Sequence, residues 1–197
     1  MDRTAGWGVA EIRKVVAEAF AEDPLIGWIF PDDDRRLEAS AAWLGLFLEG
    51  YVEAGRIDVV EEGDELVAVA VWRIPHDAPL PRPELPSIPG LLAALVGGPR
   101  SAAIGAGLHV LTSAWPQGPF AYLHFLAVSP QHQRRGMGRQ VIQPGLAAAE
   151  AAGLGVELES TNPENLSFYR SLGFAVTREL VIEPDGPPAW AMWRPHA

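Results

Sequence analysis

The stretch LHFLAVSPQHQRRGMGRQVI, residues 123–142, joins a buried strand to a helix through a loop rich in arginine and glycine. The run Ala121–Val128 is almost continuously apolar, which is typical of a strand buried on both faces. Ser129 and Pro130 then turn the chain, and a helix is predicted from Gly136. Free N–H groups and the helix dipole favour an anion at such a helix start, and glycine lets the backbone approach it closely. The stretch therefore predicts a strand–loop–helix cradle for a phosphate group.

Three known phosphate-binding patterns can be compared with this loop. A P-loop needs GxxxxGK followed by Ser or Thr, and the sequence contains no such string. The dinucleotide-binding pattern GxGxxG begins at Gly136 and Gly138 but has Val141 at its third position. The pattern that remains is QxxGxG, from Gln133 to Gly138. Taken alone, that hexapeptide could also be a glycine-containing turn with no ligand.

A second motif follows in the string NPENLSFYRSLGF, residues 162–174. Asn162 and Pro163 are typical of a helix start, and the glycine near the end of the string suits a helix end. Asn165 and Tyr169 are four residues apart, so they share one face of the predicted helix. An isolated tyrosine in such a place is more often a core aromatic, but two motifs in this order weaken that interpretation.

The two motifs, QxxGxG and NxxxYxxxGF, resemble those of the GNAT superfamily of N-acetyltransferases. The resemblance implies that Asn165 contacts the pantetheine arm of acetyl-CoA and that Tyr169 protonates the departing CoA thiolate. A phenol suits that role, because a thiol with a pKa of about 8.5 leaves more easily when a proton is supplied. The resemblance covers nearly the whole chain. The strings AEAFAEDP (17–24), AVAVW (68–72) and AWAMWRP (189–195) look like the puromycin N-acetyltransferase branch.

The resemblance implies acetyl-CoA as the acetyl donor. The loop is expected to hold its pyrophosphate, and the strand before the loop is expected to pair with the pantetheine amides. The residues expected to bind acetyl-CoA are Leu126, Ala127, Val128, Gln133, Arg134, Arg135, Gly136, Met137, Gly138, Arg139, Asn165 and Phe168. No metal is expected, because the chain has no cysteine and its five histidines show no HExxH pairing.

An amine must lose a proton before it attacks, so a proton acceptor is expected on the two strands that should flank the acetyl group. His124 is one candidate, with a pKa that is ordinarily near neutral, and a structural histidine is the equal alternative. Glu159 is the other, acting through water, or else as an orienting carboxylate. With Tyr169, these two residues are the expected catalytic group.

The order of predicted strands and helices along the chain predicts one α/β domain over residues 1–197, with a mixed twisted sheet flanked by helices. Six prolines within 75–90 mark a loop, and the segment 75–119 is interpreted as a lid-like insertion over the acceptor side. Only about eight residues precede the first helix, so the first strand usual in the superfamily is short or missing. Helices are predicted at 9–22, 35–54, 88–96, 100–114, 136–152 and 163–172, and strands at 57–60, 66–72, 121–128, 155–159, 175–183 and 189–194.

Composition limits the classes of function. The formal net charge of −10 makes the chain a poor partner for nucleic acid. No run of about 18 apolar residues is present, so no membrane span is expected. No signal peptide is expected either, and the lack of cysteine fits a cytoplasmic protein. A homodimer is left open.

The expected function is transfer of acetyl from acetyl-CoA to a primary amine of a small molecule, by direct attack in a ternary complex. The alternatives are a catalytically silent acyl-CoA-binding sensor module and a protein Lys or N-terminal acetyltransferase. Tyr169 favours an enzyme, because a mere binder needs no proton donor. The apolar segment 88–115 favours a covered pocket over an open groove. That apolar cover predicts hydrophobic primary amines as acceptors in preference to polycationic aminoglycosides.

Overall fold

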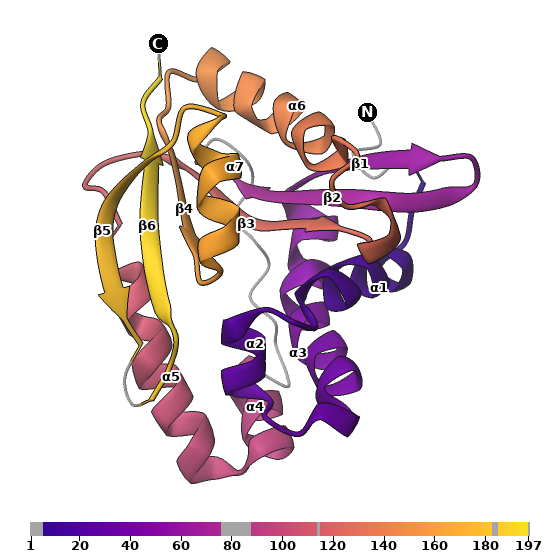
Figure 1. Ribbon diagram of the computed structural model, residues 1–197, viewed down its shortest axis with the longest axis vertical. Helices are drawn as coiled ribbons and strands as arrows, with labels where there is room; N and C mark the ends of the chain where they lie inside the picture. Colours follow the sequence, from indigo (N-terminus) through magenta and orange to yellow (C-terminus); the bar gives the residue numbers. More distant parts are fainter. Residues whose placement is uncertain (1–5, 76–87, 114, 183–184, 197) are drawn as a thin grey trace.

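The computed structural model describes residues 6–75, 88–113, 115–182 and 185–196, and these form one α/β domain (Figure 1). Six strands form a single sheet in the order β1-β2-β3-β4-β6-β5. Only β3 and β4 pair in parallel, so the sheet is mixed. The strands are β1 (Arg56–Glu62), β2 (Glu65–Arg73), β3 (Ala121–Val128), β4 (Val156–Ser160), β5 (Ala175–Val181) and β6 (Pro188–Arg194).

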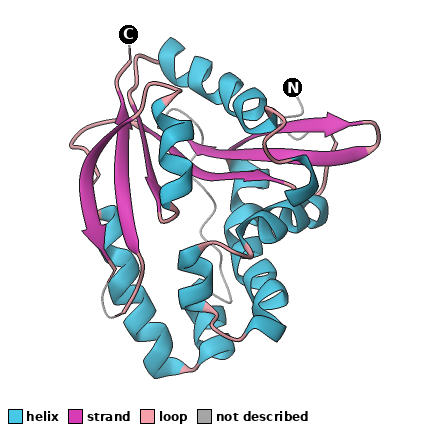
Figure 2. Ribbon diagram, viewed as in Figure 1, coloured by secondary structure: helices cyan, strands magenta, loops and turns pink. Residues whose placement is uncertain are grey.

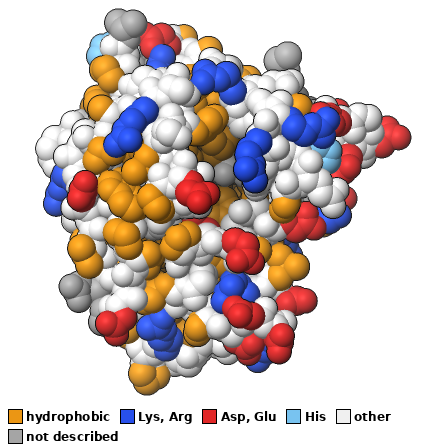
Figure 3. Space-filling model, viewed as in Figure 1, with side chains coloured by type: hydrophobic (Ala, Val, Ile, Leu, Met, Phe, Trp, Pro, Cys, Tyr) orange, Lys and Arg blue, Asp and Glu red, His pale blue; other side chains and the backbone are white. Residues whose placement is uncertain are grey.

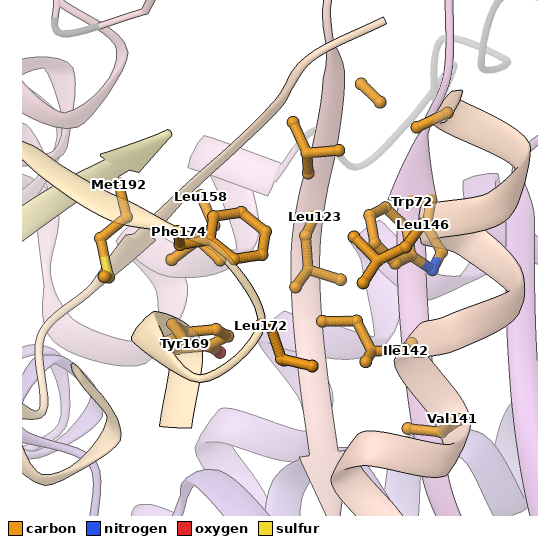
Figure 4. Close-up of a cluster of buried hydrophobic side chains, with 14 of the residues drawn as sticks. Trp72, Leu123, Val141, Ile142, Leu146, Leu158, Tyr169, Leu172, Phe174 and Met192 are labelled. Carbon is orange, nitrogen blue, oxygen red and sulfur yellow. The ribbon is translucent and has the colours of Figure 1, made fainter. Parts of the chain in front are cut away.

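Helices cover both faces of this sheet (Figure 2). Their bounds are α1 (Val9–Phe20), α2 (Pro24–Ile29), α3 (Asp33–Ala54), α4 (Ile88–Val96), α5 (Gly98–Thr112), α6 (Met137–Ala151) and α7 (Leu166–Arg170), with short 3₁₀ turns at Pro130–His132 and Pro163–Asn165. α6 and α7 pack on one face in a core that includes Trp72, Leu123, Ile142 and Tyr169 (Figure 4). α1, α2 and α3 pack on the other face.

The sheet opens between its two parallel strands. β3 and β4 pair only at Ala121–Val156 and Tyr122–Glu157. Within β3, Leu123 and Phe125 pair with two consecutive residues of β2, so His124 is the extra residue of a β-bulge. A bulge bends its strand and increases its local twist. As a result, the far half of β3 presents an edge toward β4 that is unpaired among the described residues.

The fold class predicted from the sequence is confirmed. The described residues before α1, 6–8, contain no strand, in line with the short segment available there. α4 and α5 correspond to the two helical pieces predicted near 88–96 and 100–114. The centre of the predicted insertion, residues 76–87, lies outside the described part of the chain.

One helix was missed in the sequence. Asp23 and Pro24 were predicted to end the first helix, but they begin the next one. α1 ends at Phe20, and the Asp23 carboxylate caps α2 by accepting the Leu25 N–H at 2.9 Å. Proline suits the first helical position because that position needs no N–H donor. This turn places Asp23 beside the opening between β3 and β4.

A close approach of α6 to β2 gives a test of the core. Gly145 lies on α6 against the fully buried Trp72, and an added Cβ would overlap the indole ring. Gly145→Ala should therefore lower the free energy of unfolding by about 1–3 kcal/mol in urea titrations. Gly105→Ala is the matched control, because that glycine lies in α5 with no atom within 4 Å of an added Cβ. It should stabilise by about 0.5–1 kcal/mol. Equal effects of the two substitutions would contradict the packing described.

Candidate active site

The loop between β3 and α6 has the backbone geometry of an anion cradle. Arg134 and Gly136 both lie in the left-handed region, with φ of 59° and 89°. Left-handed residues alternating with ordinary ones turn successive N–H groups toward one point. Gly136 also caps α6, whose first N–H groups have no partner within the helix. The loop and the start of α6 therefore present backbone N–H groups of the kind that bind an anion.

Side chains of the loop hold it in place. The Gln133 side-chain amide donates to the Val128 carbonyl at 3.2 Å, which ties the loop back to β3. Arg135 donates to Glu62 on the β1–β2 hairpin at 3.2 Å, and Arg139 donates to the Ser171 hydroxyl at 2.6 Å. Arg135 and Arg139 thus anchor the loop, with Glu62 and Ser171 as their partners.

The two sequence motifs meet at Gly138. A Cβ added there would lie 3.4 Å from the Phe168 ring and 3.6 Å from Val128. Gly138 therefore lets the start of α6 approach α7 and the end of β3 closely. Leu126, Asn165 and Tyr169 line a pocket on the other side of this contact. The structure thus brings the QxxGxG and NxxxYxxxGF segments together at Gly138 and Phe168.

That pocket occupies the opening between β3 and β4 and has a volume of about 370 Å³. Figure 3 shows a hollow lined by hydrophobic side chains near the middle of the face on which α7 lies. Most of the lining is aromatic or aliphatic, from α1, α2, α3, α5, β3 and β4. Its ionisable side chains are Asp23, Tyr51, Arg73, Tyr122, His124, Glu159 and Tyr169.

Tyr169 combines a buried ring with a place in the pocket. The ring packs edge-on against Phe168 and Phe174, and only 8 % of the residue is exposed. Burial raises the pKa of Tyr169 above its usual value, and the charge of Asp23 raises it further. The phenol is therefore protonated at neutral pH, as a proton donor must be.

Glu159 is held by two donors. The Trp115 indole N–H donates to its Oε1 at 2.9 Å, and the Tyr122 hydroxyl donates to its Oε2 at 2.7 Å. Burial raises the pKa of Glu159 to about 6, while these hydrogen bonds and the Arg73 charge oppose that shift. Glu159 is consequently ionised at neutral pH, with both oxygens engaged.

His124 lies in the same half of the pocket. Its Nδ1 is 2.9 Å from the Tyr51 hydroxyl, and its ring stacks on Phe125 with 4.0 Å between centroids. Burial lowers the pKa of His124 to about 3, and the Arg73 charge lowers it further. The imidazole is therefore neutral at neutral pH and is a weak base.

Four ionisable pocket residues were missed by reasoning from the sequence: Asp23, Tyr51, Arg73 and Tyr122. The Arg73 guanidinium lies 4.5 Å from the centre of the Trp115 ring, at the end of β2. The Asp-Pro pair at 23–24 signals a helix cap, but nothing local shows that the cap faces β4. Trp115 also lines the pocket, whereas Trp28 lies beneath Arg100.

Neither a metal cluster nor a membrane span was found in the described ranges. No group of three or more His, Cys, Asp or Glu residues there is arranged to hold a metal ion. Likewise, no described helix is both long and apolar enough to cross a bilayer.

Comparison with known proteins places this geometry in a family. The sequence pattern of the acetyltransferase (GNAT) family matches residues 14–174. N-alpha-acetyltransferase RimI of Mycobacterium tuberculosis is 33 % identical over 79 residues, which are 39 % of this chain. The matched part spans 50 % of that curated relative. The chain therefore belongs to the acetyltransferase (GNAT) family, whose members are N-acetyltransferases that use acetyl-CoA.

Solved structures agree with this assignment. A structure from Corynebacterium glutamicum, described as histone acetyltransferase HPA2 and related acetyltransferase, is 26 % identical. It has a TM-score of 0.66 and covers 96 % of this chain and 91 % of its own. The C-terminal condensation domain of Ebony, solved with beta-alanyl-dopamine, is 13 % identical with a TM-score of 0.66, covering 95 % and 93 %. At that identity, the second likeness concerns the fold alone.

A buried carboxyl next to the pocket gives a pH-dependent test. Glu157 is 1 % exposed on β4, and its Oε1 has no hydrogen-bond partner within the described chain. Burial raises its pKa from 4.5 to about 8, and the charge of Glu159 adds to that rise. Between pH 4.5 and about 8 this carboxyl is protonated in the folded protein and ionised in the unfolded chain, so folding takes up a proton. The free energy of unfolding therefore falls as the pH rises through this range. The fall levels off above about pH 8.

Glu157→Gln should remove that dependence. The variant should gain stability over the wild type by up to about 1.4 kcal/mol per pH unit between about pH 5 and 8. Urea unfolding at a series of pH values measures the difference. Parallel stability curves for the two proteins would show that Glu157 titrates normally.

Proposed function

We propose that this protein transfers the acetyl group of acetyl-CoA to a primary amine of a small molecule, by direct attack in a ternary complex. The observation that carries the proposal is the single pocket between β3 and β4. It is lined both by the general-acid candidate Tyr169 and by Glu159 among aromatic side chains. One cavity can thus hold a thioester and an amine in contact, which accounts for a large part of the rate in two-substrate reactions.

Acetyl-CoA would occupy the side formed by the two motifs. The backbone N–H groups of Arg135, Gly136 and Gly138 would bind its pyrophosphate, because the cradle is formed by the left-handed turns at 134 and 136. Gln133, Arg134, Met137 and Arg139 complete that loop. The edge of β3 at 126–128 would pair with the pantetheine amides, since β4 diverges from it there. Asn165 and Phe168 would flank the arm from α7.

The chemistry needs one proton removed and one supplied. The neutral amine attacks the thioester carbonyl carbon, a C–N bond forms, and the C–S bond breaks. Tyr169, which its raised pKa keeps protonated at neutral pH, gives its proton to the departing thiolate. Glu159 adds negative charge on the acceptor side, and the neutral His124 ring forms part of the chamber wall.

The charge and shape of the acceptor side favour a monocation with an aromatic or aliphatic body. Asp23 and Glu159 carry negative charge, and Arg73 offsets one of them, so the chamber as a whole favours one positive charge. Aromatic rings, among them Trp43, Phe47 and Trp115, make up much of the wall. An aminoglycoside with several ammonium groups would need more carboxylates than this lining provides. The resemblance to the puromycin N-acetyltransferase branch supports the same class of acceptor.

A protein N-terminus is the second candidate acceptor, because the 33 % identity over 79 residues is to an N-alpha-acetyltransferase. Against it, α5 and Trp115 lie over the acceptor side and line the pocket together with α2 and α3. A peptide needs an open groove for the residues that follow its first amine. A silent acyl-CoA sensor is less well supported, because Tyr169 has the place and protonation state of a proton donor.

An amine panel tests the proposal directly. Release of CoA thiol from acetyl-CoA should be fastest with 2-phenylethylamine or an aminonucleoside, at least tenfold above kanamycin and above a short peptide with a free N-terminus. Mass spectrometry should show one added acetyl group on the amine. Faster acetylation of kanamycin or of the peptide would overturn the proposed acceptor class.

Tyr169→Phe tests the role of the phenol. Turnover should fall by roughly 10²–10⁴, because the thiolate would leave without a proton donor. The dissociation constant of acetyl-CoA by calorimetry, and the melting temperature, should change little, because the ring that packs on Phe168 is retained. A loss of turnover below about fivefold would make Tyr169 a packing residue only.

A further inference from the structure

The groups that could take a proton from the acceptor are not equally available. Glu159 already accepts hydrogen bonds from Trp115 and Tyr122 on its two oxygens. His124 contacts the Tyr51 hydroxyl through Nδ1 and, stacked on Phe125 in a buried position, is a weak base. Glu159 is thus oriented by two donors from the pocket wall, and His124 is too weak a base to hold a proton at neutral pH.

Asp23 has a different arrangement. The Leu25 N–H and the Thr161 hydroxyl both donate to its Oδ1 atom at 2.9 Å. Its Oδ2 atom accepts no side-chain hydrogen bond among the described residues. The carboxylate is partly buried and lines the pocket. The Ile26 backbone also hydrogen-bonds to this carboxylate. Asp23 is therefore oriented by the start of α2 and by Thr161, with its carboxylate on the pocket wall.

The position of Asp23 relative to Tyr169 also matters. Thr161 directly follows β4, so its hydrogen bond holds Asp23 at the end of β4 where β3 has diverged. Asp23 is close enough to Tyr169 for its charge to perturb the phenol. Glu159 lies two residues earlier on β4, deeper along the same face. Of the two pocket carboxylates, Asp23 is thus the one beside the general-acid candidate.

We propose that Asp23 binds the ammonium group of the acceptor and takes its proton, which makes it the base of the reaction. This inference rests on the proposed function. The ammonium gives one proton to the Asp23 carboxylate, which later releases it to solvent. The amine then forms the C–N bond as the C–S bond breaks, and the thiolate leaves with the proton of Tyr169. The second proton lost by the adduct nitrogen restores the Tyr169 phenol.

The acid–base properties of Asp23 agree with this role. Burial raises its pKa above 3.8, although hydrogen bonds from Thr161 and from the Leu25 and Ile26 backbone oppose the rise. The ionisable groups that share the pocket with it are Tyr51, Arg73, Tyr122, His124, Glu159 and Tyr169. As the pH falls through the raised pKa, Asp23 is protonated, so kcat/KM for the amine should fall on the acid side.

Asp23→Asn separates this role from helix capping. Asparagine is as good an N-cap as aspartate, and its side-chain oxygen can still accept from Leu25 and Thr161. We expect kcat/KM for 2-phenylethylamine to fall at least 10²-fold, with the acetyl-CoA dissociation constant and the melting temperature little changed. Asp32→Asn is the matched control, since Asp32 caps α3 in the same way and does not line this pocket. Its kcat/KM should stay within twofold.

Thr161→Val is a second variant that does not touch the carboxylate. It removes a hydrogen bond that lowers the pKa of Asp23, so the acid limb of the kcat/KM profile should move to higher pH. If the acid limb of Thr161→Val is unchanged, the inference is contradicted, even if Asp23→Asn fails to fold. The inference is also contradicted if kcat/KM of Asp23→Asn lies within threefold of the wild-type value. Failure of the wild type to acetylate any amine would instead refute the proposed function, and this inference with it.

Discussion

The structure depends on the divergence of β3 from β4. Two parallel strands that would otherwise pair along their length are joined at only two residue pairs, and the bulge at His124 bends β3 away. Unpaired backbone groups on a buried strand edge are costly unless a ligand or solvent satisfies them. The opening therefore provides both a pocket and a strip of backbone that can bind an extended amide-bearing arm. Asn165 and Tyr169 of the second motif line this pocket.

Enclosure then sets the chemistry of the pocket. Desolvation is the largest cause of each pKa shift there: it keeps Tyr169 protonated, keeps His124 neutral, and raises the pKa of Glu159 toward neutral pH. The same physical effect on the same lining thus produces a protonated phenol, a neutral imidazole and a carboxyl group with a pKa near neutral pH. The two carboxylates differ in their hydrogen-bond partners. Trp115 and Tyr122 donate to Glu159, whereas Thr161 and the backbone at the start of α2 donate to Asp23.

The sequence predicted those parts of the site that depend on local signals. The loop 133–138 and the helix with Tyr169 were found because glycine, proline and asparagine have strong local preferences, and motif spacing linked the two. Asp23 was missed because an Asp-Pro pair can follow one helix or begin the next, and local sequence does not decide which. The bulge at His124 was missed because the apolar run 121–128 reads as a regular strand. The Trp115–Glu159–Tyr122 contacts join distant segments, so only the folded chain reveals them.

The central claim is that donor and acceptor meet in one continuous pocket between β3 and β4. A bisubstrate analogue, with CoA sulfur joined through an acetyl bridge to the nitrogen of 2-phenylethylamine, tests it most directly by calorimetry. If the pocket is continuous, the analogue should bind at least tenfold more tightly than CoA, since the second half binds without a further loss of translational freedom. Affinity no greater than that of CoA would mean that the acceptor does not bind where this account places it.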